Sequence, residues 1–176
     1  MKEIKSAQEW IKRKVLIKDP TIITLSGKYF EKAKTNLITM QVLSDIQSNK
    51  NVRKTLNIPD NYESDEWVIV SSYYAMYASA LALLAKIGYK SSTHTATISA
   101  LNDFFVKKKL LEKVDLAILN YAQLTKEEVN ELADARENRE IAQYGVTKKI
   151  THDLAQKSIK NAYTFVEKVG VIISKI

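Results

Sequence analysis

The chain has 176 residues, a net charge of +7, no cysteine and two histidines. This length suits one domain with a sizeable core. The composition excludes a disulfide framework, a thiolate metal site and a cysteine nucleophile, and His94 and His152 lie too far apart to form a helical zinc pair. The positive charge favours an acidic partner, nucleic acid first, although a solvated lysine-rich surface would look the same.

The first segment predicts a short helix followed by a break. Residues 6–18 suit a helix that Ser6 caps, with Glu9 completing a capping box, and Pro20 is expected to end it. Residues 21–27, TIITLSG, are rich in β-branched side chains and predict either a short strand or an extended linker. No apolar stretch of signal-peptide type precedes them, so we expect a cytoplasmic protein.

A long amphipathic helix is predicted over residues 28–48. Its apolar side chains recur at helical spacing, at Tyr29, Ala33, Leu37, Met40 and Leu43. The next stretch, residues 49–64, contains the turn signals NKN, IPDN and YESD around a short helical piece near residues 52–56.

The stretch from Trp67 to Gly88 is expected to organise the whole chain. No residue from Trp67 to Ala85 is charged, and apolar or small side chains occupy nearly every turn, which is typical of a buried helix. Ser64 or Asp65 is expected to cap it. The stretch is also long enough to cross a membrane, but its flanks lack the charge asymmetry of a membrane span. The prediction is therefore the central helix of a soluble bundle.

Three further helices are expected between Gly88 and Gly145. The first runs from about Thr93 to Lys107, with Ser91, Ser92 and Thr93 as alternative caps. Residues 110–123 make a short helix or helical turn. Thr125 and Glu128 form a capping box for a helix to about Tyr144, which Gly145 is expected to stop.

Thr151 is expected to cap the last helix, which continues to about Ser174. Its predicted inward side chains are Leu154, Ile159, Ala162, Phe165, Val169 and Ile172. Together these elements predict an all-α, up-and-down bundle of four to five main helices.

The polar segment ADARENREIAQYG, residues 133–145, carries the best candidates for a functional site. Arg136, Arg139 and Gln143 share one helix face, and Tyr144 follows. Two guanidinium groups one turn apart form a phosphate-binding surface, to which a nearby hydroxyl adds a donor. The alternative is a solvated helix with glutamate–arginine pairs.

Two histidines and a group of tyrosines are secondary candidates. His94 is expected in the first turn of a helix, where it either contacts phosphate or stabilises the turn, whereas His152 is expected to be exposed. Tyr73, Tyr74 and Tyr77 lie on the central helix. Tyrosines stack on nucleobases, but on a buried helix they are more often core residues.

Four segments of the chain together resemble the higher eukaryotes and prokaryotes nucleotide-binding (HEPN) family, in its small stand-alone archaeal and bacterial branch. They read YFEKAKTNLITMQVL, SSYYAMYASALALLAKIGYK, SSTHTATISALNDFFVK and RENREIAQYG. The resemblance extends over residues 27–145, with a last helix over 151–176. It divides the chain into an N-terminal extension, residues 1–27, and a HEPN-like bundle, residues 28–176.

The resemblance implies a homodimer with a cleft at or beside the subunit interface, and no cofactor or membrane. Many members are metal-independent endoribonucleases, often toxins encoded beside a minimal nucleotidyltransferase antitoxin. Their motif is an arginine, four to six residues, and a histidine. Six residues separate Arg136 from Gln143 here, and Arg139 to Tyr144 resembles the ending Arg-x-x-Ala-Asp-Tyr of the stand-alone branch.

Gln143 therefore stands where the family motif has histidine, and glutamine transfers no proton near neutral pH. Our first hypothesis is a protein that binds nucleotide or RNA with impaired cleavage, using Arg136, Arg139, Gln143 and Tyr144, with His94 as an accessory. The second is an active endoribonuclease in which Arg139 stabilises the oxyanion and Tyr144 or His94 transfers protons. The third is an interaction module in which the arginines pair subunits.

Overall fold

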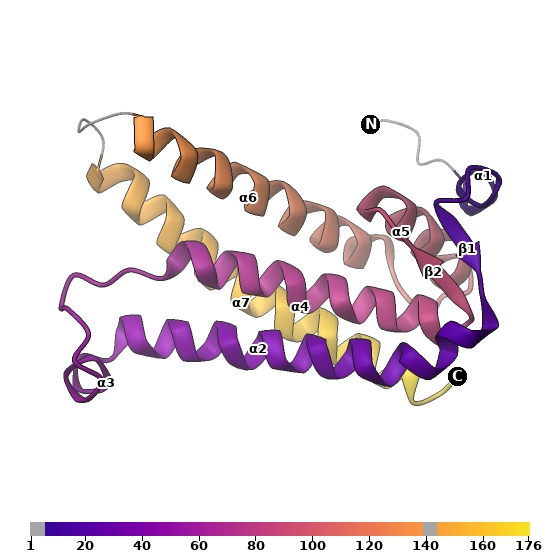
Figure 1. Cartoon of the computed structure of the whole chain (residues 1–176), viewed down its shortest axis with the longest axis horizontal. Coiled ribbons are helices and arrows are strands. Elements are labelled where there is room, and N and C mark those ends of the chain that lie inside the picture. The colour runs from indigo at the N-terminus through magenta and orange to yellow at the C-terminus, as the bar shows by residue number, and fades with distance from the viewer. Residues whose placement is uncertain (1–5, 139–143) are drawn as a thin grey trace.

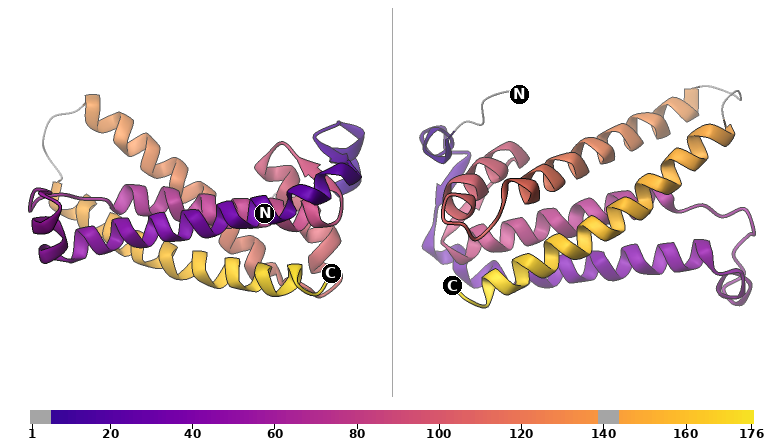
Figure 2. Two further views of the ribbon diagram at one scale, coloured as in Figure 1. Left: turned by 60° about the horizontal axis from the view of Figure 1, so that its bottom comes forward. Right: turned by 180° about the vertical axis from the view of Figure 1, so that it is seen from behind.

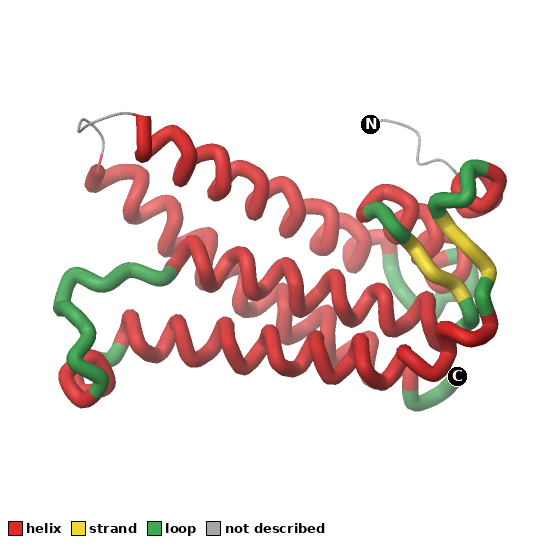
Figure 3. Tube along the Cα trace, viewed as in Figure 1, coloured by secondary structure: helices red, strands yellow, loops and turns green. Residues whose placement is uncertain are grey.

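Four long helices form an elongated bundle in the computed structural model, which describes residues 6–138 and 144–176 and the side chains of 6–127 and 152–176. They are α2 (Ser26–Ser48), α4 (Asp65–Lys86), α6 (Lys113–Asn138) and α7 (Tyr144–Ile173). Neighbours in the chain run in opposite directions (Figure 1). Helices dominate the described chain, with one small strand pair at one end (Figure 3), so the all-α prediction is confirmed.

Helix α4 is the core of the bundle, as its uncharged sequence predicts. It packs against α2, α6 and α7, and the rear view on the right of Figure 2 shows α7 crossing in front of it. Met76, Leu83 and Leu84 on α4 are fully buried. Buried hydroxyl groups of α4 bond within the helix, as when Ser72 donates to the Val68 carbonyl at 2.8 Å. Although α4 is long and apolar enough to cross a membrane, most of that stretch is buried, as in the core helix of a soluble protein.

Small residues let α2 and α7 pack closely against each other and against α4. Ala33, Ala75 and Ala78 form a cluster with Val166, and a Cβ atom added at Gly170 would lie only 2.9 Å from Cζ of Phe30. The helices therefore pack in a register that larger side chains at these positions would disturb.

The helix predicted over residues 6–18 is wrong beyond Lys12. Helix α1 spans Ala7–Lys12 and begins as expected, with the Ser6 hydroxyl accepting from the Glu9 amide at 3.4 Å. The chain then turns at Lys14, whose φ is 58°, and enters strand β1 (Leu16–Lys18). Strand β1 pairs antiparallel with β2 (Tyr89–Ser91), so a contact distant in sequence overrides the local helical preference.

The strand or linker predicted over residues 21–27 is also wrong, because Pro20 begins a 3-10 helix, Pro20–Leu25, and α2 already starts at Ser26. The Asp19 carboxylate caps this helix by accepting from the Thr21 amide at 3.0 Å and from the Thr21 hydroxyl at 2.6 Å. A proline in the first turn has no amide hydrogen to lose, which is why it starts the helix here.

The connection between α2 and α4 contains the expected short helix, α3 (Lys50–Thr55), which Asn49 caps. Ser64 occupies the N-cap position of α4, but its hydroxyl donates to the Leu43 carbonyl at 2.8 Å and does not accept from α4. This serine therefore ties the start of α4 to α2.

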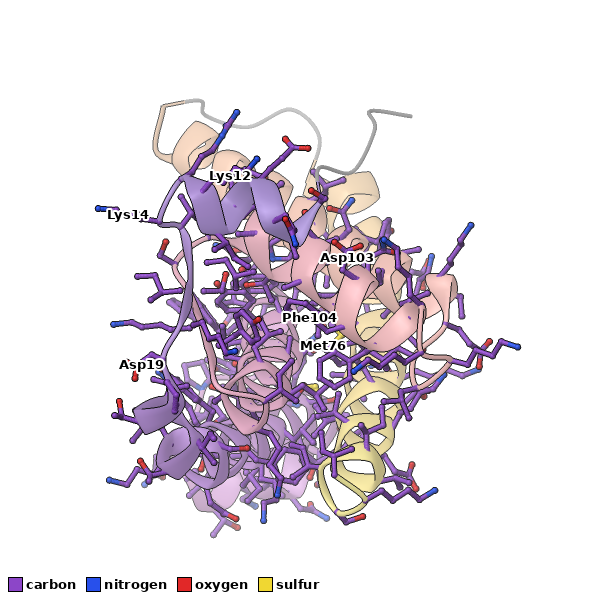
Figure 4. All side chains as sticks on the ribbon, turned by 90° about the vertical axis from the view of Figure 1, so that its right-hand side faces the viewer. Lys12, Lys14, Asp19, Met76, Asp103 and Phe104 are labelled. Atoms are coloured by element: carbon purple, nitrogen blue, oxygen red, sulfur yellow. The ribbon has the colours of Figure 1, made fainter. Side chains whose placement is uncertain are left out.

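The helix predicted from Thr93 to Lys107 starts where expected but changes its geometry. Helix α5 (His94–Leu101) is capped by Thr93, and a π-helical turn follows over Asn102–Val106. Within this turn, Asp103 accepts from the Ala7 amide and from Lys107 Nζ, both at 2.7 Å, and so fixes α1 against this end of the molecule (Figure 4).

The break predicted between a helix over residues 110–123 and a second from Thr125 to Tyr144 is wrong, because α6 is continuous from Lys113 to Asn138. Thr125 is buried inside α6 and donates to the Tyr121 carbonyl at 3.0 Å, so it caps nothing. Tyr144 begins α7, which also passes through Gly145 and Thr151, so neither of these acts as the predicted stop or cap. The predicted inward face of α7 is confirmed at Ala162, Phe165, Val169 and Ile172.

Candidate functional site

The described ends of the predicted phosphate-binding segment belong to α6 and α7, and the end of α6 and the start of α7 lie at the same end of the bundle (Figure 1). Arg136 is in the last turn of α6 and Tyr144 is the first residue of α7. Arg139 and Gln143 lie outside the described residues, as do the side chains of Arg136 and Tyr144. The helix face predicted for Arg136, Arg139 and Gln143 therefore stays a prediction.

A second group, the His94 cluster, brings together His94 of α5, Tyr73, Tyr74 and Tyr77 of α4, and Lys126 of α6. The centroid of the His94 ring lies 5.7 Å from that of Tyr77 and 6.0 Å from that of Tyr73. The Tyr73 and Tyr77 rings stack with centroids 5.7 Å apart and planes 8° apart. The Lys126 ammonium lies over the Tyr73 and Tyr74 rings, 5.0 and 5.6 Å from their centroids.

The imidazole of His94 is held in its neutral form. Both ring nitrogens are buried, and neither has a hydrogen-bond partner in the described structure. Burial lowers the pKa of His94 to about 4, with Glu127 raising it and Lys126 lowering it further. Burial likewise raises the pKa of Tyr73 well above its usual value, with smaller contributions from Tyr77, Tyr74 and Glu127. These groups form a packed aromatic core with little access for a ligand.

The outer edge of this cluster is accessible. Tyr74 is 44% exposed, and Trp67, two turns earlier on the same face of α4, is 64% exposed. Exposed aromatic rings beside a lysine can stack nucleobases while the ammonium group binds phosphate. This face of α4 is therefore the part of the His94 cluster that could meet a nucleic acid.

A hydrogen-bonded chain of three side chains joins α2, α4 and α7 at the end of the molecule where α7 begins. His152 Nδ1 lies 3.1 Å from both carboxylate oxygens of Asp65, and Gln47 Nε2 donates to Asp65 Oδ2 at 2.8 Å. The His152 side chain is 51% exposed and that of Asp65 only 15%. The sequence predicted His152 to be exposed but gave no sign that it pairs with Asp65, because 87 positions separate the two residues.

Among the described residues, no group of three His, Asp or Glu side chains is placed to hold a metal ion. The described side chains can supply an ammonium group for phosphate, exposed rings for bases, and one oriented imidazole.

Comparison with known proteins identifies the family. A sequence model of the HEPN domain matches residues 54–172, more than half of the chain. A UPF0332 protein of Archaeoglobus fulgidus is 30% identical over 105 residues, which cover 60% of this chain and 73% of that protein. No solved structure matches the chain significantly. The matched region includes the central helix and both helices that flank the arginine segment. The chain therefore belongs to the HEPN family.

Proposed function

We propose that this protein binds RNA or a nucleotide at the α6–α7 end of its bundle, through Arg136, Arg139, Gln143 and Tyr144. The observation that carries the proposal is the family match, which spans both α6 and α7. Membership of the HEPN family supports a nucleotide-binding, RNA-binding or nuclease-like function. The net charge of +7 supports an anionic ligand.

The proposed roles follow from side-chain chemistry. Arg136 and Arg139 would bind phosphate oxygens through paired N–H groups. Gln143 and Tyr144 would add hydrogen bonds. Gln143 cannot act as an acid or base, so this segment would bind RNA without being able to cleave it on its own.

The proposal includes a homodimer and a nucleotidyltransferase partner, as in a toxin–antitoxin pair. An apolar stripe on α6 supports a subunit contact: Val114, Tyr121 and Leu124 share one face and are 55%, 39% and 50% exposed. Sedimentation equilibrium tests the dimer, and Leu124→Lys is expected to weaken it because the substitution buries a charge in the contact.

Gel retardation of a single-stranded RNA in EDTA tests the binding site. The wild type is expected to retard the RNA, and an Arg136→Ala/Arg139→Ala variant to bind more weakly, with a salt dependence about 1.4 less steep on logarithmic axes, since two phosphate contacts are lost. The control is Lys28→Ala/Lys32→Ala, which removes the same charge from exposed positions on α2.

Equal binding by the two double variants would place the RNA on another surface. Absence of binding by the wild type would favour the interaction module, in which the arginines pair subunits, and the Arg136→Ala/Arg139→Ala variant would then be a monomer.

A further inference from the structure

We infer that a separate surface, at the end of the bundle formed by α1, β1, β2 and the turn after α5, binds the phosphate backbone of double-stranded RNA. This end lies across the molecule from the end of α6 and the start of α7 (Figure 1). Helix α4 joins the two ends, and its 22 residues span about 33 Å. The surface is therefore distinct from the arginine segment, and the inference does not depend on the function proposed above.

The positive charge of the chain is concentrated at this end. Residues 6–25, 86–92 and 102–113 contain ten lysine and arginine residues and four aspartate and glutamate residues, so they contribute +6 of the net charge of +7. The fold brings the three segments together, because β1 pairs with β2 and the Ala7 amide donates to Asp103 at 2.7 Å. Charges that are far apart in the sequence therefore lie on one end of the molecule.

Eight exposed cations form this surface, the basic end. They are Lys12, Arg13, Lys14, Lys18, Lys90, Lys107, Lys108 and Lys109. Figure 4 looks onto this end of the molecule and shows the side chains of Lys12 and Lys14 pointing away from the bundle. An anionic partner can therefore approach them from solvent.

The carboxylates of the three segments are mostly occupied within the molecule, whereas the cations are not. Asp103 binds Lys107, Asp19 caps the 3-10 helix, and Glu112 lies 3.1 Å from the ammonium group of Lys168. Among the described side chains, Lys107 alone of the basic end forms an ion pair. The charge of the other seven cations is therefore available to an external anion.

Two lysines of the basic end have a backbone conformation that lysine rarely adopts. The φ angles of Lys14 and Lys109 are 58° and 60°. The remaining non-glycine residue with positive φ in the described chain is Asn57, and asparagine tolerates this conformation. Glycine would occupy the two lysine positions without strain. Strained backbone is typical of functional sites, so lysine at both positions indicates a role for the ammonium groups beyond folding.

The aromatic side chains of the three segments point to a ligand whose bases are paired. Phe105 is buried, and Trp10, Tyr89 and Phe104 pack against the core, where Trp10 Nε1 donates to Ser99 Oγ at 2.9 Å. These rings are not presented for stacking on unpaired bases. Lysines without exposed rings bind phosphate groups as point charges, and duplex RNA is recognised largely through its backbone and shape.

The same features disfavour a protein or a membrane as the partner. The cores of protein–protein interfaces are depleted in lysine, which makes up seven of the eight cations here. Binding to a lipid surface requires an apolar face with outward aromatic or aliphatic side chains. At this end only Ile17 and Ile23 are large apolar side chains with substantial exposure, among the described residues of the three segments.

The experiment measures binding of the full-length protein to a fluorescent RNA duplex of about 20 base pairs by anisotropy, in EDTA and at several salt concentrations. Lys18→Gln/Lys90→Gln/Lys108→Gln removes one cation from each segment. It is expected to lower the affinity about tenfold or more and to make the salt dependence less steep by about 2.7 on logarithmic axes, since three phosphate contacts are lost. The matched control is Lys50→Gln/Lys54→Gln/Lys160→Gln, at exposed positions outside this end, which is expected to bind as the wild type does.

Lys14→Gly/Lys109→Gly separates binding from folding. Glycine relieves the backbone at both positions, so the midpoint of thermal unfolding is expected to rise by about 2–4 °C while the affinity for the duplex falls. A purely structural role would not produce these opposite shifts. Asn57→Gly relieves the same backbone conformation without removing a charge, and it is expected to bind the duplex as the wild type does.

Three results would overturn the inference. The first is wild-type affinity in Lys18→Gln/Lys90→Gln/Lys108→Gln. The second is loss of duplex binding in Arg136→Ala/Arg139→Ala, which would place the duplex at the other end of the bundle. The third is a wild type that ignores the duplex but sediments with vesicles of equimolar phosphatidylglycerol and phosphatidylcholine, which would make the basic end a membrane surface. Retardation of single-stranded RNA through the arginines is measured separately, so either function can fail without the other.

Discussion

His94 shows how a single side chain couples this fold to pH. The folded protein holds the imidazole in its neutral form because its nitrogens are buried without partners, whereas in the unfolded chain it takes up a proton near pH 6.5. The pKa of His94 is about 4 in the folded protein, which is below its value in the unfolded chain. The contribution of this residue to stability is therefore complete above pH 6.5 and is lost as the pH falls toward 4.

We therefore expect the free energy of unfolding to fall by at most about 3 kcal/mol from this residue between pH 7 and pH 4. Urea unfolding of the wild type and of His94→Phe at several pH values checks this prediction. The variant keeps an aromatic ring against Tyr77. The carboxylates titrate in both proteins, so the difference between their unfolding free energies at each pH reports the imidazole alone. The prediction would be contradicted if the unfolding free energies of the two proteins changed in parallel with pH.

Lys168 neutralises an almost fully buried carboxylate. Its Nζ lies 2.7 Å from Asp115 Oδ2, and the Asp115 side chain is only 5% exposed. This hydrogen bond is the main reason that the pKa of Lys168 is raised. Asp115 also accepts from the Glu112 amide at 2.7 Å, so the pair holds the start of α6 against α7.

Lys168→Met is expected to destabilise the protein by about 2–3 kcal/mol, because it leaves the Asp115 charge buried without its ammonium partner. Lys160→Met, an exposed position on the same helix, is expected to change stability by less than about 0.5 kcal/mol. Chemical unfolding gives the free energy of unfolding of both variants. Equal values would show that the Lys168–Asp115 pair contributes little to stability.

At the scale of elements, the sequence predicted the long helices well and the short elements poorly. The periodic apolar residues of α2, the uncharged run of α4 and the inward face of α7 each follow from local pattern alone. The strands β1 and β2 have three residues each, and their stability comes from pairing across the fold, which no local pattern records.

The false breaks in α6 and α7 have the same cause. By residue type, a capping box is formed by Thr125 and Glu128. Helix α6 nevertheless continues past both residues. Its packing on the bundle, through Leu116, Leu119 and Ala122, stabilises the continuous helix. The arginine segment of the proposed site is visible in the sequence. The pairing of His152 with Asp65 is not, since only the packing of α7 on α4 brings them together.

Gly170 tests how closely α7 packs on α2. Gly170→Leu is expected to cost about 2–3 kcal/mol, because even its Cβ would lie 2.9 Å from Phe30 Cζ. Gly27→Ala, near the start of α2, has nothing within 4 Å of the added Cβ and is expected to stabilise by about 0.5 kcal/mol. Thermal unfolding of the two variants would reveal opposite shifts, and a stable Gly170→Leu protein would mean that the helices can separate.

At the scale of the whole molecule, the N-terminal segment and the bundle share one hydrophobic core. Ala7 and Leu16 belong to the same buried cluster as Met76, Leu101 and Phe165. The boundary between residues 1–27 and 28–176 stays a prediction from family resemblance, while the packing joins the two parts physically.

Leu16→Ala is expected to lower the global unfolding free energy by about 2–4 kcal/mol, since the side chain is fully buried. Ile17→Ala is the natural control, because Ile17 follows on the opposite face of β1 and is 45% exposed. Helix content and tryptophan fluorescence should report one shared transition for Leu16→Ala. Two separate transitions would show that the N-terminal segment unfolds independently.

The pairing of β1 with β2 also sets an order of events during synthesis. Lys18 pairs with Tyr89, so roughly seventy residues must leave the ribosome after β1 before its partner is available. At about 5–20 residues per second, β1 waits several seconds with its backbone unpaired. Lys12, Arg13, Lys14 and Lys18 surround this strand with positive charge, which discourages association with other nascent chains in that interval. Strand β1 is thus made before α2 and α4 but finds its partner only after both of these helices have been made.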